Sequence, residues 1–289
     1  EEPHPGRRHP PSLPLSLRPA PTMTASGPSS KPPSSRSSAE NLVLSVDALP
    51  TAPAPLKVLL LMSDTGGGHR ASAEALLAAF DELLPGGHET TIVDVFFDVA
   101  GPPLASFPRF YGFCQRHPLL WKLFFESGKL GPLRGAAEAA MRLFTWRALE
   151  DYLAAKTPDL IVSVHPMVQD LTLAALRGLE PSPPPASDPR KCLPPFMVVV
   201  TDLGGAHPMW FHPLADAIYV PTETLHDLAL TERGVTSDQL RTFGLPLRQG
   251  FWESPAAGAK AAMREKLGMP AAPPAVLVLS GGDGIGVGA

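Results

Sequence analysis

The sequence is poor in cysteine and tyrosine, and it lacks long apolar runs. Its 289 residues include 2 Cys and 3 Tyr, and 7% of them are aromatic. Two cysteines, Cys114 and Cys192, are too few for a disulfide framework, which fits a reducing compartment. No apolar run approaches the roughly 18 residues that a transmembrane helix requires. We therefore expect neither a disulfide-stapled secreted fold nor a membrane-spanning segment.

Acidic residues are missing from most of the N-terminal region. Residues 3–39 hold five Arg or Lys and no Asp or Glu, and they are dense in Pro and Ser. This composition buries too little apolar area to offset the lost chain entropy, so residues 1–55 are expected to be a disordered tail. An organelle transit peptide has the same composition and stays open as an alternative. The net charge of -4 gives no basic field, so we expect no nucleic-acid partner.

From residue 56 onward, short apolar runs alternate with helical patterns. Five runs are mostly continuous in apolar residues, as in parallel strands covered on both faces, and they lie at 57–62, 90–95, 159–164, 196–201 and 216–220. Helical patterns lie at 70–84, within 107–155, at 168–178 and at 223–233. This order predicts an α/β fold with a Rossmann-like, doubly wound parallel sheet.

The stretch GLPLRQGFW is expected to end the first domain, and a second α/β unit is expected to begin after it. A short helix around 259–267 and a strand over 275–280 then meet GGDGIG. We expect a first domain over 56–250, and a linker with the truncated start of a second Rossmann-like domain over 251–289. One strand alone cannot pair its backbone groups, so this last part is expected to be loosely held.

Titratable and aromatic residues follow the carboxyl ends of four predicted strands, where open α/β sheets bind their ligands. In chain order they are Asp64 with His69, then Asp94, then His165, and then Asp202 with His207, Trp210 and His212. Because the carboxyl ends of parallel strands meet at one edge of the sheet, the pattern predicts one cleft at that edge.

Three glycines, Gly66, Gly67 and Gly68, stand where the first predicted strand passes into a helix. Glycine admits backbone angles closed to other residues, and a helix N-terminus offers free N–H groups to an anion. Gly66, Gly68 and Ala71 fit the fingerprint G-x-G-x-x-A, with Asp94 as the acid for a ribose, so an NAD-dependent oxidoreductase is one alternative. A Walker loop is excluded, because no Gly-Lys-Ser/Thr follows.

Four motifs resemble monogalactosyldiacylglycerol synthase of plants and algae. In chain order they are VLLLMSDTGGGHRASAEAL, VTDLGGAHPMWFHP, FGLPLR and VLVLSGGDGIG. The resemblance implies the acceptor half of a two-domain GT-B glycosyltransferase, which moves galactose from UDP-galactose to the hydroxyl of 1,2-diacylglycerol. The UDP-sugar would bind the second domain, so the 289-residue chain alone is expected not to bind it. A diacylglycerol glucosyltransferase and a non-catalytic lipid-binding remnant are the alternatives.

An α-linked donor that yields a β-linked product reacts with inversion, which needs a general base beside the acceptor hydroxyl. His69 is the candidate base: a pKa of about 6.5 suits proton removal at neutral pH, and the resemblance puts the family's catalytic histidine here. Asp202 is the second candidate, or the group that orients the base. The competing interpretations are a solvent-facing helix residue for His69 and a turn aspartate for Asp202.

The resemblance also implies binding residues. The predicted acceptor-binding residues are Gly66, Gly67, Gly68, His207, Pro208 and Trp210, and the predicted donor-binding residues are Gly281, Gly282 and Asp283. Trp210 is equally open to being an ordinary core residue. His165, His207 and His212 each precede proline and fit structural turns as well. Their spacing matches no closed zinc site, and we expect neither a metal nor a cofactor.

Diacylglycerol stays in the bilayer, so an enzyme that uses it must come to the membrane surface. Residues 107–147 hold nine aromatic residues and seven Arg or Lys against two Glu, a mixture that suits an anionic headgroup boundary. The predicted membrane contacts are Arg109, Arg116, Trp121, Lys122, Phe124 and Phe125. The alternative is a pair of core helices with a solvated basic face. The resemblance implies activation by anionic lipid and peripheral attachment to the chloroplast envelope, and a homodimer is left open.

Overall fold

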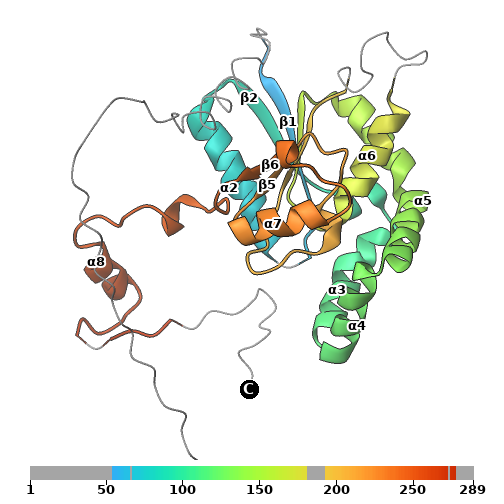
Figure 1. Ribbon diagram of the computed structural model, residues 1–289. Helices are drawn as coiled ribbons and strands as arrows, with labels where there is room; N and C mark the ends of the chain where they lie inside the picture. Colours follow the sequence, from blue (N-terminus) through green and yellow to red (C-terminus); the bar gives the residue numbers. More distant parts are fainter. Residues whose placement is uncertain (1–53, 66, 181–192, 273, 278–289) are drawn as a thin grey trace, which may run out of the picture. The chain divides into compact units, whose positions relative to one another are not determined.

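The computed structural model describes residues 54–65, 67–180, 193–272 and 274–277 (Figure 1). Several predictions concern residues outside the described ones. They are those for nearly all of the N-terminal tail, for Gly66, for most of the proline-rich loop at 178–195, and for Gly281, Gly282 and Asp283.

The described part of the chain contains one sheet of six parallel strands in the order β2-β1-β3-β4-β5-β6. The strands are β1 (Leu56–Met62), β2 (His88–Asp94), β3 (Leu160–Ser163), β4 (Phe196–Val199), β5 (Ala217–Val220) and β6 (Leu240–Thr242). The first five coincide with the predicted apolar runs. Strand β6 was not predicted, because its sequence LRT buries only Leu240 and carries no apolar run.

The helices also follow the sequence pattern closely. They are α2 (Gly67–Leu83), α3 (Phe107–Gln115), α4 (Pro118–Lys129), α5 (Gly131–Lys156), α6 (Gln169–Gly178), α7 (Glu223–Thr231) and α8 (Ala259–Lys266). The predicted helical stretch within 107–155 is three helices. Pro118 and Pro132 each stand in the first turn of a helix, where proline is tolerated and where it stops the preceding helix.

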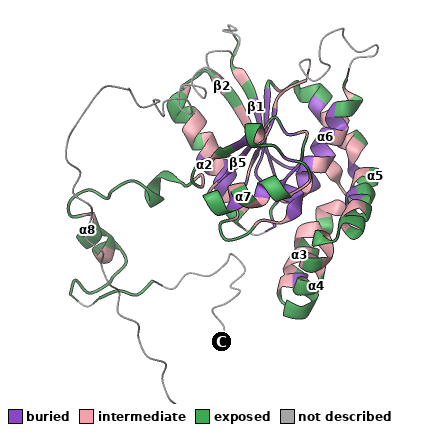
Figure 2. Ribbon diagram, in the orientation of Figure 1, coloured by how far each residue is buried: buried purple, intermediate pink, exposed green. Residues whose placement is uncertain are grey.

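Helices cover both faces of the sheet, which confirms the doubly wound fold (Figures 1 and 2). Side chains alternate between the faces along β1. Leu60 and Met62 pack in one cluster with Phe80 of α2. Leu59 and Leu61 belong to a second, larger cluster with side chains of α5, α6 and α7. The strands are therefore buried on two sides, as their continuous apolar runs predict.

The order of the strands creates a topological switch point. The chain leaves β1 for β2 in one direction, returns past β1 to β3, and then continues outward to β6. Open α/β sheets bind their ligands at the carboxyl ends of the two strands where the direction reverses, which here are β1 and β3. Residues that follow these two strands are thus brought to one place.

The chain beyond residue 250 forms little regular structure in its described part. Helix α8 lies where it was predicted, but residues 275–277 form no strand, and Val276 and Leu277 are 87% and 79% exposed. Residues 278–289 lie outside the described residues, so the start of a second Rossmann-like domain stays a prediction. None of the helices described here is long and apolar enough to cross a membrane.

Candidate functional site

His69 lies in the first turn of α2, and its ring reaches the residue that follows β3. Its Nδ1 is 2.8 Å from the carbonyl oxygen of Val164 and 3.3 Å from the hydroxyl of Thr201. A carbonyl oxygen only accepts hydrogen bonds, so the neutral ring carries its proton on Nδ1 and the lone pair on Nε2. Burial lowers the pKa of His69, and the hydrogen bond to Val164 is the largest opposing influence. The ring is thus held in the form that a general base needs.

His165 supports the ring of His69. It is 2% exposed, and the two ring centroids are 4.5 Å apart in an edge-on arrangement. Its Nδ1 accepts from the N–H of Met167 at 3.3 Å, so Nε2 carries the proton and donates to the hydroxyl of Thr65 at 2.7 Å. Burial, with His69 as the second cause, holds the pKa of His165 well below its ordinary value. His165 therefore stays neutral and positions its neighbour.

Asp202 lies in the loop after β4 and is held by two donors of its own loop. Its Oδ2 accepts from Nε1 of Trp210 at 2.7 Å, and its carboxylate also accepts from the backbone N–H of His207. Burial raises the pKa of Asp202, and the bond from Trp210 opposes that shift. The charges of Asp202 and His69 attract each other, which favours an orienting and charge-stabilising role for the carboxylate.

Trp210 is fully buried in the larger core cluster, and its ring centroid lies 6.0 Å from that of His69. Pro208 is buried as well. In this arrangement Trp210 connects the core to the site by donating to Asp202. Direct contact of Trp210 or Pro208 with an acceptor stays a prediction.

Three of the histidines that precede proline follow β3 or β4 in the chain, and these three share one local geometry. In His165, His207 and His212 the Nδ1 atom accepts the backbone N–H two residues later, at 3.3, 3.2 and 3.2 Å. The imidazole thus does what an Asn or Asp cap does at the start of a helix. This geometry matches the structural-turn interpretation. Among the described residues, no group of three His, Cys, Asp or Glu is placed to hold a metal ion.

Asp94 is buried, and backbone donors occupy both of its carboxylate oxygens. Its Oδ1 accepts from the N–H groups of Phe96 and Phe97, each at 3.1 Å, and its Oδ2 accepts from the N–H of Asp64 at 3.0 Å. Asp94 therefore caps the π-helical turn Val95–Ala100. A ribose-binding acid must present its carboxylate to the ligand, so this geometry argues against the dinucleotide interpretation.

Of the three glycines before His69, Gly67 and Gly68 belong to the described residues and Gly66 does not. Gly67 and Gly68 begin α2, and a Cβ built on Gly68 would meet nothing within 4 Å. The protein atoms around position 68 thus leave room for a side chain there, and close packing does not explain why this residue is glycine. Close approach of an acceptor to these glycines stays a prediction.

The predicted membrane contacts lie on the α3–α4 pair and fall into two sets. Arg109, Arg116 and Lys122 are exposed, whereas the three aromatic residues are half-buried. Phe124 packs against α3, with its ring centroid 6.0 Å from that of Phe110. Trp121 and Phe125 stack on each other at 5.0 Å. The basic residues are thus free to meet a surface, while the aromatic residues mainly join the helices to their neighbours.

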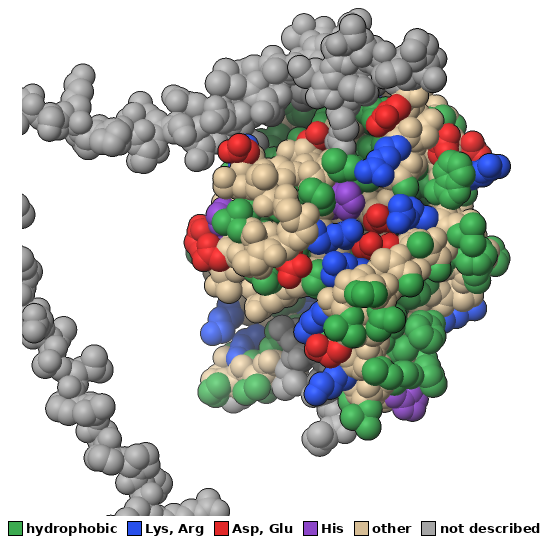
Figure 3. Space-filling view, turned by 45° about the vertical axis from the view of Figure 1, so that its right-hand side comes forward, with side chains coloured by type: hydrophobic (Ala, Val, Ile, Leu, Met, Phe, Trp, Pro, Cys, Tyr) green, Lys and Arg blue, Asp and Glu red, His purple; other side chains and the backbone are tan. Residues whose placement is uncertain are grey.

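The predicted membrane contacts do not include the apolar residues that this pair exposes most. Leu119, Leu123 and Phe113 are 85%, 68% and 51% exposed. On the face shown in Figure 3, hydrophobic side chains gather at the lower right, beside Lys and Arg side chains. The i, i+4 spacing of the two leucines on a helix is the signal that would have found them.

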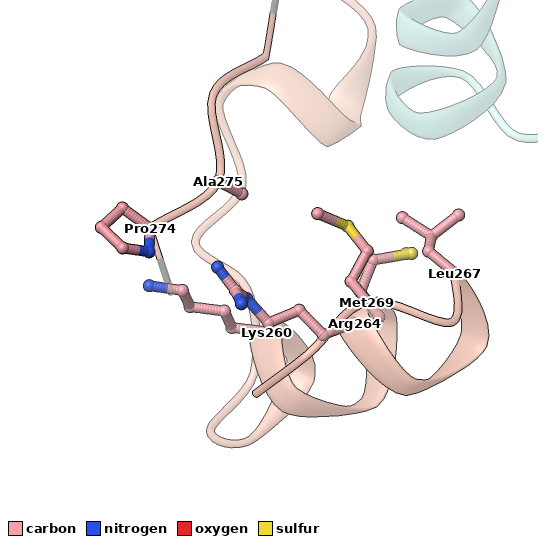
Figure 4. Close-up of a pocket in the computed structure, with 7 residues that line it drawn as sticks. Lys260, Arg264, Leu267, Met269, Pro274 and Ala275 are labelled. Atoms are coloured by element: carbon pink, nitrogen blue, oxygen red, sulfur yellow. The ribbon is translucent and has the colours of Figure 1, made fainter. Parts of the chain in front are cut away.

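A separate shallow hollow lies in the segment that carries α8 (Figure 4). Its lining includes Lys260, Leu267 and Met269, and none of the predicted site residues is part of it. The switch point, with its converging polar side chains, is therefore the better candidate for chemistry.

The fold and the site together define a Rossmann-like α/β domain with a histidine and a carboxylate at its switch point. The family model for monogalactosyldiacylglycerol (MGDG) synthase matches residues 69–247, a range that begins at His69 itself. The chain belongs to the MGDG synthase family, as the four motifs predicted.

Curated relatives agree with this assignment. The chain is 38% identical over 234 residues to the chloroplastic MGDG synthase of Spinacia oleracea, which covers 80% of this chain and 42% of the relative. It is 37% identical over 250 residues to MGDG synthase 1, chloroplastic, of Arabidopsis thaliana, covering 84% of this chain and 44% of the relative. MGDG synthase 2 of Arabidopsis thaliana is 37% identical over 229 residues, 79% of this chain and 46% of the relative. The chain spans less than half the length of these relatives.

Proposed function

We propose that this chain is the acceptor-side domain of an enzyme that transfers galactose from UDP-galactose to the hydroxyl of 1,2-diacylglycerol. The reaction proceeds with inversion and yields monogalactosyldiacylglycerol. The curated relatives carry the name of this activity. The observation that supports it most is the hydrogen bond from Nδ1 of His69 to the carbonyl of Val164, because it leaves Nε2 free to accept a proton.

His69 acts as the general base in this proposal. Its Nε2 takes the proton of the acceptor hydroxyl while the oxygen bonds to C1 of galactose and the bond from C1 to UDP breaks. The ring becomes an imidazolium in this step. Burial lowers the pKa of His69, and the nearby charges of Asp202 and Asp64 partly oppose this shift, which favours the protonated product of the step.

The substrates reach this base from two sides. The acceptor comes from an anionic membrane surface on which α3 and α4 rest, with the glycines at 66–68, His207, Pro208 and Trp210 around its glycerol. Gly281, Gly282 and Asp283 contact the UDP-sugar. Attachment is peripheral, at the chloroplast envelope, and anionic lipid activates the enzyme without a metal or cofactor. Exposed basic and apolar side chains on α3 and α4 support the membrane contact.

Product analysis tests the reaction. A protein that carries this region together with the remaining length of its relatives is incubated with diacylglycerol in micelles containing phosphatidylglycerol, and with UDP-galactose or UDP-glucose. We expect a β-linked galactolipid, identified by the coupling of its anomeric proton, and little glucolipid. Preferential glucose transfer would identify a glucosyltransferase. If neither donor gave a product, the non-catalytic, lipid-binding interpretation would be favoured.

The oxidoreductase alternative has a test of its own. NADH is titrated against the 289-residue chain, and we expect no saturable binding, since Asp94 is already occupied by backbone donors. Saturable binding at micromolar concentration would favour the oxidoreductase instead.

A further inference from the structure

The C-terminal part of α4 holds the imidazole of His207. The ring donates a hydrogen bond to the backbone carbonyl of Phe125, and the rings of these two residues meet edge-on with centroids 5.2 Å apart. A Cβ built on Gly128 would lie 2.5 Å from Nε2 of His207, closer than real Cβ atoms approach. The absence of a side chain at Gly128 thus lets α4 pack directly against the ring of His207.

The same imidazole is bound to the loop after β4. Its Nδ1 accepts from the N–H of Met209 at 3.2 Å, so Nε2 is the atom that donates to α4. The backbone N–H of His207 bonds to the carboxylate of Asp202, which also accepts from Trp210. The Trp210 ring lies 6.0 Å from that of His69. Direct contacts therefore run from α4 to the candidate base.

The ring must be neutral for this arrangement, because a protonated Nδ1 cannot accept from Met209. Burial lowers the pKa of His207, and the positive charges of Arg134 and Lys129 lower it further, against the opposing effects of the Phe125 carbonyl and Glu126. The contact of His207 with both partners is thus maintained at neutral pH.

The far side of α4 faces outward. By the period of 3.6 residues per turn, Leu119 and Leu123 lie on the face opposite Phe125 and Gly128. These two leucines are among the most exposed apolar residues of the described chain. One face of α4 is therefore free to contact a surface while the other face packs against His207.

We propose that His207 is a positioning residue that links α4 to the loop carrying Asp202, so that contact of α4 with an anionic lipid surface orders this loop around His69. The inference rests on the function proposed above, because it takes a lipid surface as the partner of α4. The link consists of one imidazole with both nitrogens in use, and the loss of either bond separates the helix from the loop.

Hydrogen exchange of the 289-residue chain, followed by mass spectrometry, tests the link. The probe is vesicles of phosphatidylcholine with phosphatidylglycerol. We expect the vesicles to slow exchange in α4 and, by about tenfold, in residues 202–212. Gly128→Ala pushes a methyl group against His207 and is expected to keep the effect in α4 but lose it in 202–212. Gly112→Ala is the matched control: it adds the same methyl group to α3, where nothing lies within 4 Å, and should behave as the wild type.

A second pair of variants works without vesicles. His207→Gln keeps one acceptor and one donor, whereas His207→Leu keeps the bulk and loses both bonds. In an NMR titration we expect His207→Leu to raise the pKa of His69 toward about 6.5, because a loosened loop relieves its burial. His207→Gln should match the wild type in this pKa and in loop exchange.

Two results would overturn the proposal: vesicle protection of residues 202–212 that persists in Gly128→Ala, or a His69 titration and loop exchange unchanged in His207→Leu. A wild type that binds no vesicles would show that the lipid partner in the proposed function is wrong, and the coupling would fail with it. The His207 pair would then still decide whether the residue positions the loop.

Discussion

Nδ1 of His69 lies 2.8 Å from the carbonyl oxygen of Val164, and this contact determines which ring nitrogen is available for chemistry. His69 follows β1 and Val164 follows β3, so the contact joins the two strands of the switch point. The acceptor is a main-chain atom. Its position therefore depends on the pairing of β1 with β3 and not on the identity of the side chain at 164.

Folding stability should depend on pH through His165. Its pKa in the folded protein lies well below the value of about 6.5 in the unfolded chain. Below about pH 6.5 the unfolded state therefore binds a proton that the folded state does not, and the free energy of unfolding falls as the pH drops toward the folded-state pKa. His165→Asn keeps an acceptor for the Met167 N–H and does not titrate, so it should reduce the slope by at most about 1.4 kcal/mol per pH unit, a limit approached only below about pH 5.5.

Urea unfolding at several pH values between about 5 and 7 measures both slopes. His207 is present in both proteins, so its contribution cancels in the comparison. Equal slopes in wild type and His165→Asn would mean that the folded protein accommodates a protonated His165.

The ion pair between Glu138 of α5 and Arg233 after α7 should be important for stability. Glu138 is 4% exposed, and Arg233 donates to both of its oxygens, at 2.8 and 3.3 Å. Arg233→Met leaves a buried carboxylate without its partner, which should cost roughly 3–5 kcal/mol in the free energy of unfolding. The double variant with Glu138→Met should recover most of the loss. Chemical denaturation of the wild type and both variants measures both effects, and a loss under about 1 kcal/mol in Arg233→Met would class the pair with ordinary surface ion pairs.

The exposed leucines of α4 should carry much of the membrane binding. Replacing Leu119 and Leu123 with Ala removes apolar area from the contact and should weaken vesicle binding about tenfold or more. Leu83→Ala is the matched control, since Leu83 is 76% exposed on α2, which covers the other face of the sheet. Phe124→Ala, in contrast, should lower the melting temperature, because Phe124 packs on α3.

Sedimentation with neutral and anionic vesicles, at low and high salt, measures this binding. The basic residues Arg109, Arg116, Lys122 and Lys129 should make it stronger on anionic vesicles and weaker at high salt. Equal binding to both vesicle types would reduce the basic residues to a solvated face.

The fold was predictable because β1 to β5 are continuous apolar runs and the helices between them carry the helical period. Strand β6 was not predicted because this short edge strand buries only one side chain, that of Leu240, and so shows no apolar run. The three-helix division of 107–156 depends on Pro118 and Pro132, which mark helix starts that a hydrophobic pattern does not show.

The site was predictable only as a set of residues. Strand ends meet at one edge of any parallel sheet, so His69, Asp202 and Trp210 could be grouped together. Their contacts could not be predicted, because His69 and Val164 are 95 residues apart and meet only through the order of β1 and β3. The full burial of Trp210 and the link of His207 to α4 likewise depend on how the loop after β4 packs.

The central claim is that His69 is the general base, and the turnover of His69→Gln tests it most directly. The measurement uses the protein with the full length of its relatives, at saturating UDP-galactose and with diacylglycerol in anionic micelles. Glutamine can still donate to the carbonyl of Val164 but cannot accept the hydroxyl proton as a base. We predict that turnover falls by about 10²–10⁴-fold, the usual contribution of a positioned acid–base group, while the melting temperature is unchanged. Near-normal turnover in a folded His69→Gln would contradict the account and transfer the role to Asp202.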